Sequence, residues 1–220
     1  MKSFASLTIS VPLAISLAAA MIPSLAETPG ASPSSATSAS YGRLPLSFEA
    51  NQGQADPSVQ FLSHGQGYTL FLRPFEAVLT LANPRPATAK DPLAAKRPLA
   101  QPPVLHIKLR GANAKASATR EGEQITKTNY FLGNDSTQWH TKVPNYSRVR
   151  YSSVYPGIDL VYYGNHRRLE HDFAVAPNAD PGKIDLSFEG MKTLAIDHTT
   201  GDIFIKTTAG DIRLFKPIRA

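Results

Sequence analysis

Two acidic side chains on one predicted strand are the best candidates for chemistry in this sequence. Glu170 and Asp172 lie two positions apart in the strand expected over Leu169–Val175, so they project from the same face. Asp159, on the preceding predicted strand, should lie nearby. Grouped carboxylates act as acid and base in glycoside hydrolysis, or hold Ca²⁺ through their oxygens. The alternative, which alternation alone explains, is a solvated sheet face with inward-facing neighbours at Leu169, His171 and Phe173.

An aromatic-rich middle section is the second candidate site. Its members are Trp139, Tyr151, Tyr155, Tyr162 and Tyr163. Exposed rings beside Asn and Asp suit sugar binding, and we expect Trp139 and Tyr163 to act as the platform, with Asp159, Glu170 and Asp172 beside them. Aromatic residues are also common packing residues in strands, which is the favoured alternative. Because Tyr162 and Tyr163 are adjacent, one should point inward and the other outward.

Other kinds of chemistry lack a motif. The chain has no cysteine, which excludes disulfides, thiolate zinc sites and cysteine nucleophiles. Its six histidines have no compact metal-binding spacing, and the closest pair is His166 and His171. Gly65 and Gly67 lead into a predicted strand rather than the helix that a phosphate loop needs. We therefore predict a protein that is not an enzyme and that uses no cofactor or metal.

The net charge of +6 does not point to nucleic acid. Much of it falls on residues 83–103, which carry Arg85, Lys90, Lys96 and Arg97 against Asp91. The remaining basic residues form no stripe with interleaved aromatics, which is the usual footprint of a nucleic-acid-binding face. We expect no nucleic-acid partner.

The first residues have the pattern of a secretion signal. Lys2 gives a positive start, Phe4–Ile22 is uncharged and apolar, and Ser24-Leu25-Ala26 supplies small residues for cleavage after Ala26. The alternative is a membrane anchor, since the apolar run is about long enough to span a bilayer, but Pro23 and the small residues favour removal. We predict an exported, extracytoplasmic protein (secreted, periplasmic or at the cell surface) with no stable membrane insertion after cleavage.

The rest of the chain predicts one β-domain. Residues 27–43 are rich in Ser, Ala, Pro and Thr and predict a flexible linker. From residue 44 to 220 the apolar residues repeat with a period of two, and turn signals recur every 8–12 residues or so. This pattern predicts an antiparallel β-sandwich-like domain of about 10–14 short strands. Residues 83–103 predict a Pro-rich exposed loop.

Several blocks in this domain resemble a known bacterial family. The blocks are Pro45–Gln54, Phe61–Leu72, Asn129–Asp135, Val154–Asn165, Leu169–Phe173, Ala176–Pro181 and Phe188–Gly190. They resemble the uncharacterised N-terminal domain of secreted bacterial proteins that carry SBBP repeats, of the seven-bladed β-propeller type. His171 departs from the family pattern, in which a tyrosine is usual. Family members continue beyond the position of Ala220, so a fragment, a truncated gene and a stand-alone form are alternatives.

The resemblance implies an exported β-domain without an established activity. We therefore expect a non-catalytic structural or interaction module of a cell-surface or secreted protein, whose partners are other domains of that protein or an extracellular glycan. The alternatives are a polysaccharide-binding module that uses the aromatic cluster and, less favoured, a carbohydrate-active enzyme that uses Glu170 and Asp172.

Overall fold

The computed structural model describes residues 3–10, 46–82, 101–165, 168–216 and 218–219. It is almost entirely antiparallel β-structure, with two short 3₁₀ helices at η2 (Ser136–Gln138) and η3 (Pro181–Lys183). Among the described residues, no helix reaches the length and apolarity needed to cross a bilayer. The predicted linker, residues 27–43, lies outside the described residues, as does most of the predicted Pro-rich loop.

One half of the main sheet is a meander built from short turns. Its strands are β2 (Phe48–Ala50), β3 (Phe61–Gly65), β4 (Tyr68–Arg73), β5 (Glu76–Leu81) and β6 (Val104–Leu109), and β11 (Leu186–Glu189) adds to the β6 edge. The turn from β3 to β4 places Gly67 at a φ of 83°, a left-handed conformation that glycine adopts without steric cost. From β2 to β6, each strand pairs with the next one in the chain. β11, which pairs with β6, comes from much later in the sequence.

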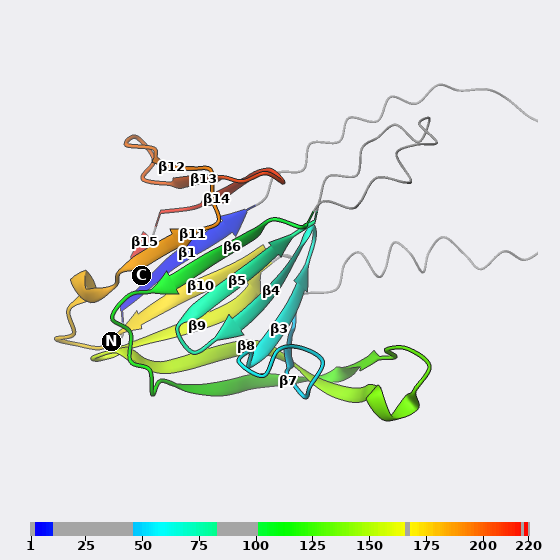
Figure 1. Cartoon of the computed structure of the whole chain (residues 1–220). Helices are drawn as coiled ribbons and strands as arrows, with labels where there is room; N and C mark the ends of the chain where they lie inside the picture. The colour runs from blue at the N-terminus through cyan, green and yellow to red at the C-terminus, as the bar shows by residue number, and fades with distance from the viewer. Residues whose placement is uncertain (1–2, 11–45, 83–100, 166–167, 217, 220) are drawn as a thin grey trace, which may run out of the picture.

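The other half contains two unusually long strands. It consists of β7 (Ser117–Tyr130), β8 (His140–Tyr155), β9 (Ile158–Asn165) and β10 (Arg168–Val175). The β7–β8 ribbon extends away from the rest of the sheet (Figure 1). Short pairing between β2 and β8 joins the two halves, with Phe48 opposite Tyr146 and Glu49 opposite Asn145.

A second, smaller sheet continues from β10 through the N-terminal strand. Strand β1 (Ser3–Ser10) pairs with β10 on one side, and with β14 (Asp211–Leu214) and β15 (Ile218–Arg219) on the other. β13 (Ile203–Lys206) and β12 (Thr193–Ile196) complete the smaller sheet. The residues of β1 belong to the predicted secretion signal, and that assignment stays a prediction.

The core lies inside the curl of the main sheet. Strands such as β6 bury every second residue, and the largest fully buried side chains include Phe48, Leu70, Leu79, Leu105 and Tyr151. The buried Tyr155 hydroxyl donates to the carbonyl oxygens of Arg110 and Asp185, at 3.0 and 3.1 Å. Since Arg110 follows β6 and Asp185 precedes β11, this bond ties the β8–β9 turn to the opposite end of the sheet.

The predicted all-β, antiparallel sandwich-like fold is confirmed. The expected alternation on β10 is also present, with Leu169, His171 and Phe173 buried in the core. Tyr162 is buried and Tyr163 is half-exposed, as their adjacency predicted. Not every strand is short as expected, however, because β7 and β8 run for 14 and 16 residues. Left-handed residues at Lys142 and Ser153 let β8 bend without ending.

Candidate functional site

Four of the five predicted site residues share the outer face of β9 and β10. In the antiparallel register, Glu170 lies opposite Tyr163, and Ala174 lies opposite Asp159. Residues directly opposite each other project from the same face, and alternation adds Asp172 to that face. The structure therefore brings Asp159, Tyr163, Glu170 and Asp172 onto one face of the sheet, as the sequence predicted. Glu170 is buried there and the other three are half-buried.

The Asp159 carboxylate is already engaged by other residues of the domain. It accepts a hydrogen bond from the backbone N–H of Ser153 at 2.9 Å and lies 3.4 Å from the Arg150 guanidinium. Arg150 also donates to Glu121 on β7 at 2.8 Å. The hydrogen bond that Arg150 donates to Glu121, against a smaller opposing effect of burial, raises the pKa of Arg150, which stays charged. Asp159 therefore stabilises the bent end of β8, where Ser153 has a φ of 54°.

Tyr163 already has a cationic neighbour. The Arg148 guanidinium lies over its ring, 5.5 Å from the centroid, on the adjacent strand β8. This cation–π contact covers part of the ring that a sugar would use. Tyr163 can still offer its remaining exposed area, because its side chain is only half-buried.

Glu170 and Asp172 differ in their surroundings. The Asn165 amide donates to Glu170 at 3.1 Å across the β9–β10 hairpin. The Oδ1 atom of Asp172, in contrast, is buried without a hydrogen-bond partner. A buried carboxylate oxygen without a donor is costly, so Asp172 is the member of this face best prepared to accept a donor from outside the domain.

Trp139 lies away from this face, at the tip of the β7–β8 ribbon. Its ring meets Phe131 edge to face at a centroid distance of 5.1 Å, and its indole N–H donates to the Gly133 carbonyl at 3.3 Å. The exposed fractions are 63% for Phe131, 51% for Leu132 and 39% for Trp139. We call these three residues the apolar tip. In the sequence, the apolar tip is indicated by two aromatic residues, Phe131 and Trp139, on either side of the turn at Gly133-Asn134-Asp135.

A buried acid beneath the ribbon was missed by the sequence reasoning. The Glu49 carboxylate accepts a short hydrogen bond from the Tyr130 hydroxyl, and Tyr130 lies 3.1 Å from Nε2 of His64. Burial and the neighbouring Glu49 carboxylate raise the pKa of the Tyr130 phenol, which stays protonated as a donor. The three residues lie far apart in the sequence, so no local pattern could have grouped them.

A second buried acid, Glu76, lies on β5. Arg73 donates to it at 2.9 Å, and Nδ1 of His106 lies 2.8 Å from its other oxygen. Burial acts to raise the pKa of Glu76, but the hydrogen bonds from His106 and Arg73 outweigh it and lower that pKa overall. In the described part of the chain, no three His, Cys, Asp or Glu residues come together as a metal site.

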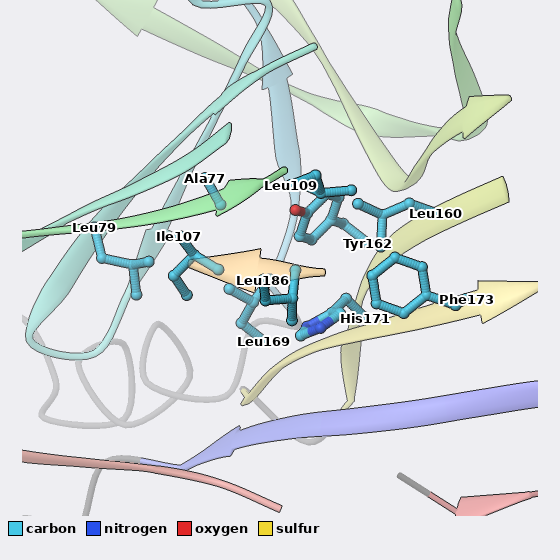
Figure 2. A pocket seen from close by; sticks show the side chains of 10 residues that line it. All are labelled: Ala77, Leu79, Ile107, Leu109, Leu160, Tyr162, Leu169, His171, Phe173 and Leu186. Atoms are coloured by element: carbon cyan, nitrogen blue, oxygen red, sulfur yellow. The ribbon is translucent and has the colours of Figure 1, made fainter. Parts of the chain in front are cut away.

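A small hollow lies inside the curled sheet, away from the acidic face. Figure 2 shows His171 within it, beside Leu169, Phe173, Tyr162 and Leu186. The space available to the centre of a water-sized sphere is about 10 Å³, which suits a single water molecule. Burial lowers the pKa of His171 to about 4, and its Nδ1 has no hydrogen-bond partner. The hollow is therefore a neutral, nearly apolar part of the core.

Comparison with known proteins assigns the domain to a family but gives no activity. Neither the curated proteins nor the solved structures include one that matches this chain. One family model matches residues 48–219, the range from β2 to β15. The chain therefore belongs to the family described as Domain of unknown function (DUF7948).

Proposed function

We propose that this chain is an exported, non-catalytic β-domain that serves as a structural or interaction module of a cell-surface or secreted protein. The secretion signal predicted in the first 26 residues supports export. The resemblance to domains that precede SBBP repeats supports a place beside other domains of one surface protein. The partner of the module is then another domain or protein of the cell envelope.

The observation that carries the proposal is the apolar tip. Phe131, Leu132 and Trp139 are exposed together at the end of a ribbon that extends beyond the main sheet (Figure 1). Burying apolar surface is favourable by about 25 cal/mol per Å², and aromatic side chains are frequent anchors of protein interfaces. A projecting ribbon with such a tip suits insertion into a partner.

The acidic face supports a structural role over catalysis. Asp159 is engaged by Arg150 and Ser153, and Glu170 is engaged by Asn165. A general acid or base must be free to exchange a proton with its substrate. These contacts suit residues that order the sheet.

Polysaccharide binding is the second candidate, and the Phe131–Trp139 pair is the observation that favours it. Edge-to-face aromatic rings hold each other in place, so one ring face can be presented to a sugar. In this arrangement the platform is the ribbon tip, with Tyr163 as a separate contact on the sheet.

The test compares the tip of the ribbon with an exposed position just before the ribbon begins. A photo-activatable cross-linker is placed at Leu132, in the tip, or at Lys115, exposed near the other end of β7. In the cells that export the protein, we expect Leu132 to cross-link to one envelope component and Lys115 not to do so. The substitution Trp139→Ser should abolish the cross-link and leave the circular dichroism spectrum unchanged.

Other results would contradict the interaction module or favour one of the alternative functions. Equal labelling at Leu132 and Lys115, or labelling insensitive to Trp139→Ser, would contradict the interaction module. Binding on a glycan array that is lost in Trp139→Ala would instead establish a polysaccharide-binding module. Turnover of a glycan that is lost in Glu170→Gln, with the fold intact, would establish an enzyme.

A further inference from the structure

The N-terminal strand occupies a position with a β-strand on each side. Ser3–Thr8 of β1 pair with Val175–Glu170 of β10. On its other edge, β1 pairs with Arg213 and Leu214 of β14 and with Ile218 and Arg219 of β15. Among the described strands, β1 is the one that links β10 to the small sheet. We call this position, between β10 and β14–β15, the strand slot.

Removal of the secretion signal would empty the strand slot. This step rests on the proposed function, because cleavage after Ala26 takes all of β1 with it. β10 would then be an edge strand, with backbone N–H and C=O groups turned toward the vacant position. Such unpaired groups are costly when they are shielded from water, so an emptied slot favours a new strand.

We propose that the strand slot of the processed protein accepts an extended segment from another protein chain, by β-strand addition antiparallel to β10. The structure shows that the slot accommodates an extended segment, because Ser3–Ser10 occupies it with pairing on both edges. The residues of this chain that follow the cleavage position suit the slot less well. Pro29 and Pro33 interrupt residues 27–33, and proline cannot donate to a sheet ladder. Residues 34–44 are free of proline, but they are mostly Ser, Ala, Thr and Gly and offer few large apolar side chains for the positions that face the core.

The side chains of β10 define the chemistry of the incoming strand. Asp172 lies opposite Ser6 in the register, and its Oδ1 atom is buried without a partner. The incoming residue at the Ser6 position should therefore be a hydrogen-bond donor, best of all a cationic one. His171 and Phe173, which face the core, lie opposite Leu7 and Ala5. The incoming residues at those two positions should be apolar, since they project toward the core. The expected partner is a proline-free strand that alternates apolar residues with a donor opposite Asp172.

The first experiment traps the register with a disulfide. The full chain, which has no cysteine of its own, carries a protease recognition sequence within residues 27–43 and the substitution Asp172→Cys. After folding and cleavage, it is mixed with excess synthetic peptide of the sequence Ser3–Ser10 carrying Ser6→Cys, and oxidised mildly. We expect a peptide disulfide at position 172 by mass spectrometry. The matched control is Ala174→Cys, which lies opposite Phe4 and should trap severalfold less peptide.

The second experiment tests the donor opposite Asp172. In the cleaved protein with Asp172 intact, the Ser6→Arg peptide should displace a fluorescent Ser3–Ser10 peptide at a concentration at least about tenfold lower than the Ser6→Glu peptide, a difference of about 1.4 kcal/mol. The substitution Asp172→Asn should remove most of that difference. A Leu7→Pro peptide should not compete.

Three results would overturn the strand slot. The first is equal trapping of the peptide at positions 172 and 174. The second is competition by the Leu7→Pro peptide at the same concentration as the parent peptide, and the third is peptide binding that occurs only after residues 27–45 are deleted. The last would show that the chain's own segment fills the position. The proposed export is tested separately, by the N-terminal mass of the protein recovered outside the cytoplasm. A protein recovered there with Met1 retained would contradict signal removal and leave the peptide results readable.

Discussion

The Tyr130 hydroxyl donates to the buried Glu49 carboxylate and so fastens the distal part of β7 to β2. This contact joins residues 81 positions apart in the chain. It lies just before the apolar tip at Phe131, Leu132 and Trp139. This phenol–carboxylate pair therefore helps to fix the orientation of the tip relative to the main sheet.

Removing this phenol should destabilise the fold. Tyr130→Phe leaves a buried carboxylate without its donor, and we expect the free energy of unfolding to fall by about 1–3 kcal/mol in urea titrations. In a Glu49→Gln background, the same substitution should lower the free energy of unfolding by less, because no buried charge is then left without a hydrogen-bond donor. Equal losses in the two backgrounds would show that Tyr130 acts through packing alone.

Stability should depend on pH through His171. An unfolded histidine has a pKa of about 6.5, whereas burial lowers the pKa of His171 to about 4. Between these values the unfolded state holds a proton that the folded state lacks, so the free energy of unfolding falls as the pH falls through this window. At about 1.4 kcal/mol per pKa unit, the loss approaches about 3 kcal/mol.

The substitution His171→Leu isolates this effect. Leucine matches the apolar lining of the hollow and cannot titrate, so the variant should gain stability relative to the parent as the pH falls from about 6.5 to about 4. Urea titrations of both proteins at several pH values measure the difference. A constant difference across that range would mean that His171 does not titrate between the two states.

Asp159 should be a stability residue. Asp159→Ala removes the acceptor for the Ser153 N–H and one partner of Arg150, and we expect a loss of about 1–2 kcal/mol in thermal or urea unfolding. Asp159→Asn, which keeps an acceptor for Ser153, should cost less. If both variants were as stable as the parent but failed to bind a glycan that the parent binds, Asp159 would be a ligand contact instead.

Two glycines with nearly equal backbone angles should respond very differently to alanine. Gly190 has a φ of 85°, and a Cβ there would lie 2.0 Å from the carbonyl oxygen of Val104. Gly67 has a φ of 83°, with nothing within 4 Å of such a Cβ. Gly67→Ala should cost about 1 kcal/mol from backbone strain. Gly190→Ala should cost about 3 kcal/mol or more, because strain and the clash add. Similar thermal shifts for the two variants would contradict the close approach of Gly190 to β6.

The sequence predicted those strands that have one buried face. Val104–Leu109 alternates half-buried and buried residues, so its period of two was visible. Strand β7 shows no such period, since it pairs with β8 alone and its residues are mostly exposed on both faces. The pairing of β11 with β6 could not be read from local patterns either, because it joins segments far apart in the chain.

The candidate site could be predicted from the sequence only where its residues lie on neighbouring strands. Strand alternation and one hairpin were enough to group Asp159, Tyr163, Glu170 and Asp172 on one face. The separate location of Trp139 depends on the length and direction of the β7–β8 ribbon, which residue types alone do not specify. Glu49, His64 and Tyr130 come from three different strands, so only the tertiary structure brings them together.

The short β2–β8 junction has a consequence for how the molecule forms. The hairpins on either side of it link neighbours in the chain, and such local pairs form early because little loop entropy is lost. The junction at Phe48–Tyr146 and Glu49–Asn145 must close a loop of nearly a hundred residues. Folding should therefore be slowed by this closure, which keeps the newly made chain open for longer than its individual hairpins require.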